Sequence, residues 1–304
     1  MKSLTNTTRI TTRDGQQLYV RVIGRGQPVL MLHGLGMKSS QWLPFILPFI
    51  GQFKFYMPDF RGFGHSASIG LNQPDVFENH AQDIQDVIQH FQLNHFYLVG
   101  YSLGATTALH LQHSPDYARV ARYLHIDQSP CVGNRPDWQH GLLGEQQASI
   151  FALFERLLQV IQPYDDTLCL QQLPLKTRRQ AVNVLGEIFE SMLGKPLIKH
   201  VYNLSAYFPA LMSTVISLSR LQDIRYYLSA YMQGQHDYRD ILGRWQIPTT
   251  VITGMQSPLY HPDGQKVVAD AMQPSRVVQF HQSGHTPLLD EPVKFIRELH
   301  RFLK

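Results

Sequence analysis

The chain has 304 residues, of which 43% are hydrophobic and 16% are charged. This length accommodates two average domains or one large α/β domain with an insertion, and the low charge excludes an intrinsically disordered chain. The net charge of +4 comes without a run of Lys and Arg, so we expect no nucleic-acid partner. Cys131 and Cys169 give neither a disulfide framework nor a zinc spacing, and we expect no metal and no cofactor.

The sequence contains only weak signals for a signal peptide or a membrane-spanning segment. The first twelve residues are polar and lack an apolar core, so no signal peptide is visible. The longest uncharged stretch, residues 200–219, has too many polar side chains to span a bilayer, and a buried or half-buried helix suits it better. We therefore expect a soluble, cytoplasmic protein without stable membrane insertion, and the sequence leaves its oligomeric state open.

The first 130 residues alternate short apolar strands with turns and helices. Two β-like runs flank Arg13-Asp14-Gly15 and predict a hairpin. Apolar strands that alternate with helices predict a parallel sheet covered on both faces. The expected strands are residues 8–12, 18–23, 28–32, 53–57, 95–99 and 120–126, and the expected helices are residues 75–91 and a stretch that ends near residue 113.

The pattern changes after residue 130 and returns near Pro248. Residues 131–246 are mainly helical in pattern, and the β/α alternation then resumes to the C-terminus. We therefore predict one α/β core domain, residues 1–130 and 247–304, interrupted by a helical cap, residues 131–246. The expected elements here are helices at 151–161, 177–193, 211–232, 264–272 and 292–303, and strands at 249–253 and 276–280.

A candidate nucleophile stands in Gly100-Tyr101-Ser102-Leu103-Gly104, between an expected strand and an expected helix. This is the context of a nucleophile elbow, in which a sharp turn strains the Ser backbone and brings its neighbours into close contact. Glycines two positions away on either side relieve that crowding. The helix that follows points its N-terminus at the site, which favours developing negative charge.

Three further motifs join this turn: His33-Gly34-Leu35-Gly36, Asp59-Phe60-Arg61-Gly62-Phe63-Gly64-His65-Ser66 and Ser283-Gly284-His285-Thr286-Pro287. With them, nearly the whole chain resembles the α/β-hydrolase superfamily, in its serine-nucleophile, cap-bearing esterase and lipase-like branch. The resemblance implies a mostly parallel, doubly wound sheet with a helical cap insertion. It also implies that His285 is the base and that the amides of Leu35 and Leu103 form the oxyanion hole.

The acid of the triad departs from the superfamily pattern. The usual position ends Gly254-Met255-Gln256-Ser257, and a serine there supplies no negative charge. Asp127, at the end of the strand 120–126, and Asp263, six residues beyond Ser257, are the two alternatives. Strand-end geometry favours Asp127, whereas Asp263 is also explained as a turn residue or helix N-cap.

These residues predict a serine hydrolase that cleaves a carboxylic ester or thioester of a small apolar substrate through an acyl-enzyme on Ser102. The alternatives are a non-catalytic binding protein or receptor on the same scaffold, and a same-fold C–C hydrolase, acyltransferase or perhydrolase. Some aromatic side chains of the cap should line the pocket, although most should pack in the core of the cap itself. We also expect Trp42, Phe45 and Ile46 to border the pocket.

Overall fold

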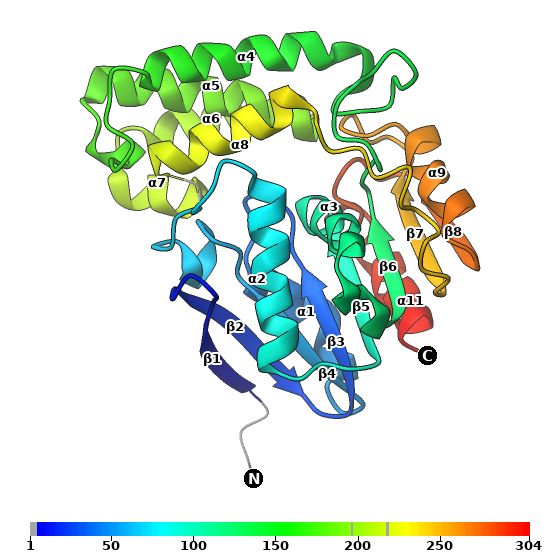
Figure 1. Ribbon diagram of the computed structural model, residues 1–304. Coiled ribbons are helices and arrows are strands. Elements are labelled where there is room, and N and C mark those ends of the chain that lie inside the picture. The colour runs from blue at the N-terminus through cyan, green and yellow to red at the C-terminus, as the bar shows by residue number, and fades with distance from the viewer. Residues whose placement is uncertain (1–4, 196, 217–218) are drawn as a thin grey trace.

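The computed structural model describes residues 5–195, 197–216 and 219–304, and its centre is an eight-stranded sheet (Figure 1). The strands are β1 (Thr5–Thr11), β2 (Gln17–Gly24), β3 (Gln27–Leu32), β4 (Phe53–Pro58), β5 (Phe96–Tyr101), β6 (Val120–Ile126), β7 (Thr249–Gly254) and β8 (Ser275–Phe280). Their order is β1-β2-β4-β3-β5-β6-β7-β8. β2 is antiparallel to both of its neighbours, and the remaining pairs are parallel. The predicted mostly parallel α/β sheet is confirmed.

Helices cover both faces of this sheet. On one face lie α2 (Val76–His90), α3 (Leu103–His110) and α9 (Pro262–Ala271), and on the other lie α1 (Leu43–Ile46), α10 (Pro287–Asp290) and α11 (Pro292–Leu303). Successive side chains of β3 alternate between the two cores, because Leu30 and Leu32 pack in the first and Val29 and Met31 in the second. All four are buried, as expected of a strand in the middle of a parallel sheet.

In the described residues between β6 and β7, five α-helices form a separate layer: α4 (Gln147–Ile161), α5 (Leu175–Leu193), α6 (Leu197–Ser205), α7 (Pro209–Val215) and α8 (Leu221–Gln233). Figure 1 shows this helical layer lying together across the carboxyl ends of the parallel strands. Its buried residues belong to the same apolar cluster as those of α2 and α3. The layer therefore closes over the edge of the sheet where α/β proteins bind their ligands.

The helix expected over residues 211–232 is wrong as a single element. α7 ends at Val215, α8 begins at Leu221, and residues 217–218 lie outside the described part of the chain. Arg220 has an extended backbone, and the flanking Leu221 amide donates to the carbonyl of Leu168 while Leu170 donates to Ser219. Backbone N–H and C=O groups that would bond within a continuous helix bond here to the segment at Leu168 and Leu170 instead. The helix is therefore broken although the apolar periodicity of the sequence continues.

Candidate active site

The sharp turn between β5 and α3 presents Ser102. Its backbone has φ 52° and ψ −118°, a conformation that costs about 1–3 kcal/mol in a non-glycine residue. A Cβ on Gly100 would lie 2.7 Å from the carbonyl oxygen of Gly104, and a Cβ on Gly104 would overlap the backbone of Leu32. Glycine is therefore required on both sides of Ser102 for the turn to close.

Ser102, His285 and Asp127 lie in one continuous chain of hydrogen bonds. The Oγ of Ser102 is 2.8 Å from Nε2 of His285, and Nδ1 of His285 is 2.6 Å from Oδ2 of Asp127. Because a carboxylate only accepts hydrogen bonds, Nδ1 carries the proton and Nε2 presents a lone pair to the Ser102 hydroxyl. Asp127 is fully buried, and Ser102 and His285 are 8% and 5% exposed. These hydrogen bonds keep the imidazole of His285 in contact with the Ser102 hydroxyl, which is still partly exposed.

Asp127 follows the last residue of β6, and its carboxylate accepts four hydrogen bonds. Besides His285, the donors are the Gly254 amide to Oδ1 at 2.8 Å, the Gln265 amide group to Oδ1 at 3.0 Å and the Ser257 hydroxyl to Oδ2 at 2.7 Å. Charge-assisted bonds of this kind stabilise the ionised carboxylate in a dry site. Its own backbone has a positive φ of 46°, so the turn after β6 is strained like the turn at Ser102.

Asp263 is not brought to this site. Its side chain is 74% exposed, and its carboxylate lies 3.4 Å from Nδ1 of His261 in the first turn of α9. Sequence reasoning missed Ser257 and Gln265 as supports of Asp127. A serine at the superfamily's usual acid position was the available signal for Ser257, whereas nothing in the spacing pointed to Gln265.

The loop after β3 orients the peptide bond between Gly34 and Leu35. His33 Nε2 accepts from the amide of Phe60 at 3.0 Å, so its Nδ1 carries the proton and donates to the Gly34 carbonyl at 2.8 Å. A second donor to that carbonyl is the amide of Met37, at 3.1 Å. In a trans peptide the N–H points opposite to the C=O, so the Leu35 N–H faces away from His33.

The loop that carries this N–H lies beside the candidate nucleophile. A Cβ on Gly34 would be 3.3 Å from the Cβ of Ser102, and Leu35 lines the cavity in front of Ser102. Leu103 is the first residue of α3, where an amide has no partner within the helix. In residues 5–195, 197–216 and 219–304, neither the Leu35 nor the Leu103 amide donates to a protein acceptor. Both amides are therefore available as donors to a group bound at Ser102.

Tyr101 supports the loop that carries His285, and sequence reasoning missed it. Its hydroxyl donates to the His285 carbonyl at 2.9 Å, and the two ring centroids are 5.4 Å apart. Burial raises the pKa of Tyr101 well above its ordinary value, so the hydroxyl keeps its proton and remains a donor. The residue before the nucleophile thereby ties the nucleophile turn to the histidine loop.

A cavity of about 770 Å³ lies between this site and the helical layer. Ser102 and His285 line it, and none of its lining side chains in the described part of the chain is Asp, Glu, Lys or Arg. Apolar side chains of the helical layer form much of its wall, including Phe154, Leu185, Ile188, Phe189, Met192, Tyr202, Ile224, Tyr227, Leu228 and Tyr231. The cavity therefore suits an uncharged, apolar ligand.

The residues after the Gly34 loop are placed differently from expectation. Phe45 lines the cavity, but Trp42 and Ile46 do not, and both are fully buried in the core beneath α11. The helical segment at residues 39–46 presents one side to the cavity and the other to the sheet, so its apolar residues are shared between the cavity wall and the core.

Neither a metal nor a membrane span is indicated within the described residues. No group of three or more His, Cys, Asp or Glu side chains is placed to hold a metal ion. No helix among them combines the length and apolar character needed to cross a bilayer.

Comparison with known proteins places this geometry in a family. Over 94% of the chain and 97% of the relative, the sequence is 25% identical to a pimeloyl-[acyl-carrier protein] methyl ester esterase of Vibrio cholerae. It is also 25% identical to an AB hydrolase superfamily protein of Bacillus subtilis, over 94% of each chain. An esterase from Exiguobacterium antarcticum superposes with a TM-score of 0.74 at 24% identity, covering 98% of this chain and 99% of its own. The alpha/beta hydrolase family model matches residues 29–298, and the chain belongs to that family.

Proposed function

We propose that Ser102, His285 and Asp127 are the catalytic triad of a serine hydrolase that cleaves carboxylic esters. The observation that carries the proposal is the unbroken hydrogen-bond chain from the Ser102 hydroxyl through His285 to Asp127. A serine hydroxyl is a weak nucleophile at neutral pH, and this arrangement supplies the adjacent base that it needs. The similarity to proteins named as esterases supports the same reaction.

In the first half of the reaction, Ser102 Oγ attacks the acyl carbon of the ester while Nε2 of His285 takes its proton. The imidazolium that forms is stabilised by the carboxylate of Asp127, which stays ionised. Negative charge develops on the former carbonyl oxygen and is met by the amides of Leu35 and Leu103. Each such donor contributes about 10²–10³ in rate. The imidazolium then protonates the leaving alcohol, and an acyl-enzyme on Ser102 remains.

In the second half, His285 removes a proton from a water molecule, which attacks the same acyl carbon. The second oxyanion forms in the same place, and collapse of the intermediate returns the proton from His285 to Ser102 as the carboxylic acid departs. A thioester would follow the same course with a thiol as the leaving group. The strained backbone at Ser102 holds Oγ in position throughout both halves.

We further propose that residues 131–246 act as a cap over the site. The segments that lead into and out of residues 131–246 run side by side. Cys131 pairs with Asp237 in a β-bridge, and the Val132 amide donates to the carbonyl of His236. The uncharged cavity beneath the layer supports an apolar acyl or alcohol group as its ligand.

The proposal is tested with p-nitrophenyl esters of graded acyl length, hydrolysed by the wild type and by Ser102→Ala. We expect hydrolysis by the wild type and a loss of about 10⁶ in kcat in the variant, as for a triad that acts as a unit. If neither protein hydrolysed any of the esters, a binding protein on this scaffold would be favoured. Measurable hydrolysis at equal rates by the two proteins would exclude Ser102 as the nucleophile.

A further inference from the structure

An exposed stripe of α6 is unusually apolar. In the described part of the chain ten large hydrophobic side chains are exposed, and five of them lie within residues 197–208. Leu197, Val201 and Leu204 are 75%, 48% and 56% exposed, and their spacing of four and three residues places them on one stripe of the helix. A helix at the surface of a globular protein normally presents polar side chains on that side. We call Leu197, Val201, Leu204, Tyr207 and Phe208 the apolar rim.

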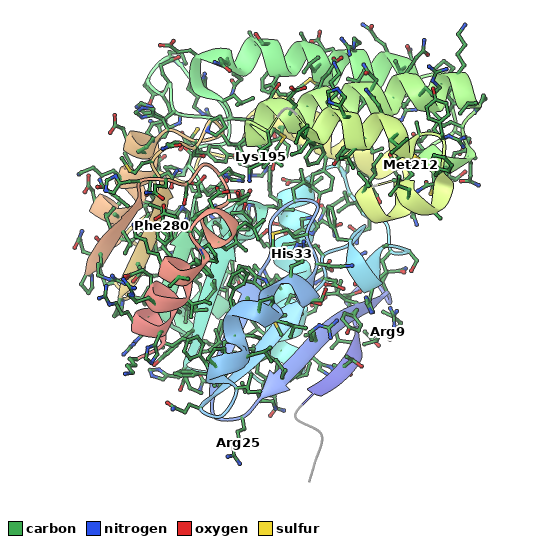
Figure 2. The ribbon with its side chains drawn as sticks, turned by 180° about the vertical axis from the view of Figure 1, so that it is seen from behind. Arg9, Arg25, His33, Lys195, Met212 and Phe280 are labelled. Atoms are coloured by element: carbon green, nitrogen blue, oxygen red, sulfur yellow. The ribbon has the colours of Figure 1, made fainter. Side chains whose placement is uncertain are left out.

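The apolar rim is continuous with the substrate cavity. Leu197 and Val201 line the cavity as well as being exposed, and so does Leu289 of α10, which is 62% exposed. Lys195, just before α6, donates to Asp290 at 3.0 Å and so holds the start of α6 beside α10. Figure 2 shows Lys195 on the side of the helical layer that faces the core. An apolar chain could therefore pass from the exposed rim to Ser102 through a cavity whose described lining contains no Asp, Glu, Lys or Arg.

The charges near the rim are compatible with a lipid headgroup layer. No Asp or Glu occurs between Ser191 and Gln222, whereas Lys195 and Lys199 do. Lys199 pairs with Glu187 at 3.0 Å, so the neighbouring carboxylate is already neutralised. Tyr207, about half exposed and covered on one face by the guanidinium of Arg179, is of the type enriched where protein meets headgroups.

These observations indicate which kind of partner binds the apolar rim. Clustered exposed apolar side chains mark interaction sites, and a cluster that opens into an uncharged cavity suits a partner that also delivers the ligand of that cavity. A lipid aggregate does both, because its apolar interior meets the rim and its molecules can enter the cavity. We propose that the apolar rim docks on a lipid surface, a bilayer or micelle, from which the ester substrate is drawn.

This docking is peripheral, because α6 is short and would lie in the plane of the surface with its apolar stripe immersed. The use of the surface as a source of ester rests on the proposed function. The docking itself does not require Ser102, so the two claims can fail separately.

The experiment is co-sedimentation of full-length Ser102→Ala protein with vesicles of phosphatidylcholine and phosphatidylglycerol. We expect the protein to sediment with the vesicles, and the further substitutions Leu204→Ser and Phe208→Ser to weaken the partition by at least about tenfold. The matched control replaces Leu175 and Val277, which are exposed apolar residues outside the rim, and it should bind like the parent. Circular dichroism and thermal melting check that each variant is folded.

A second readout uses the active enzyme. Leu204 and Phe208 are outside the described lining of the cavity, so the rim variant should hydrolyse monomeric p-nitrophenyl butyrate at the wild-type rate. Its rate on a long-chain ester above the micellar concentration should fall by at least about tenfold. Failure of the parent to sediment with vesicles, or an equal loss in the Leu175 and Val277 control, would overturn the proposal. So would a dimer that the rim substitutions dissociate in a protein that binds no vesicles.

Discussion

The substitution Asp127→Asn removes one carboxylate oxygen and leaves nearly the same shape. The carbonyl oxygen of Asn can still accept from Gly254 and Gln265, which both reach Oδ1. The new NH₂ group would take the place of Oδ2, 2.6 Å from Nδ1 of His285. Because that group donates, Nδ1 must become an acceptor, and the proton moves to Nε2. His285 then faces Ser102 with an N–H and can no longer take its proton.

The size of the effect follows from this change of tautomer. In a serine triad, loss of the correct tautomer with the geometry intact lowers kcat by about 10⁴. We expect that loss for Asp127→Asn, with a thermal unfolding curve that still shows one folded protein. The assay is the steady-state hydrolysis of a p-nitrophenyl ester. Asp263→Asn is the matched control, and it should stay within about twofold of the wild type because that carboxylate is exposed and pairs with His261 instead of a residue of the triad.

A restoring substitution sharpens the test. Ser257 Oγ lies 2.7 Å from the same Oδ2 that His285 contacts, so an aspartate at 257 can reach Nδ1 of His285. The double variant Asp127→Asn, Ser257→Asp should regain about 10–10² of the lost rate, and Ser257→Asp alone should be impaired by two adjacent carboxylates. Near-normal activity in Asp127→Asn, together with a collapse in Asp263→Asn, would refute the assignment of the acid.

Three further predictions concern the surroundings of the site. Gly34→Ala should lower kcat by about 10–10², because the new Cβ would lie 2.9 Å from the Tyr101 ring and displace the loop, and unchanged ester kinetics would contradict this. Tyr101→Phe should cost about 1 kcal/mol in the free energy of unfolding, measured with urea, because it removes the bond to the His285 carbonyl. Burial lowers the pKa of His80 to about 3 and that of His125 to about 4, so the unfolded chain binds more protons below about pH 6.5. The free energy of unfolding should therefore fall by up to about 1.4 kcal/mol per pH unit for each histidine from pH 6.5 toward 4, and urea midpoints that stay constant from pH 7.5 to 5 would contradict it.

Local sequence signals sufficed for the sheet and for Ser102 as the candidate nucleophile. The apolar run before Ser102 and the glycines around it are local requirements of a strand that turns sharply into a helix. The resemblance then identified His285 as the base. The choice of acid depended instead on which strand ends meet in space, and local spacing left both Asp127 and Asp263 open.

The parts that sequence reasoning missed depend on contacts between distant segments. Gln265 reaches Asp127 from a helix 138 residues away in the chain, and no local pattern encodes that meeting. The break between α7 and α8 likewise arises from backbone pairing with the segment at Leu168 and Leu170. The outward apolar stripe of α6 also escaped notice, because residues 200–219 suit a buried helix as well as one that faces a lipid surface.

The most direct test of the central claim is labelling of the native protein with a fluorophosphonate, followed by mass spectrometry of the peptides. The account predicts one adduct per chain, located on Ser102, because its hydroxyl faces the free Nε2 of a histidine that is held by a buried carboxylate. Labelling should be absent in Ser102→Ala and at least about 10²-fold slower in Asp127→Asn. A folded wild-type protein that takes up no label, or that is labelled elsewhere while Ser102 stays unmodified, would contradict the account.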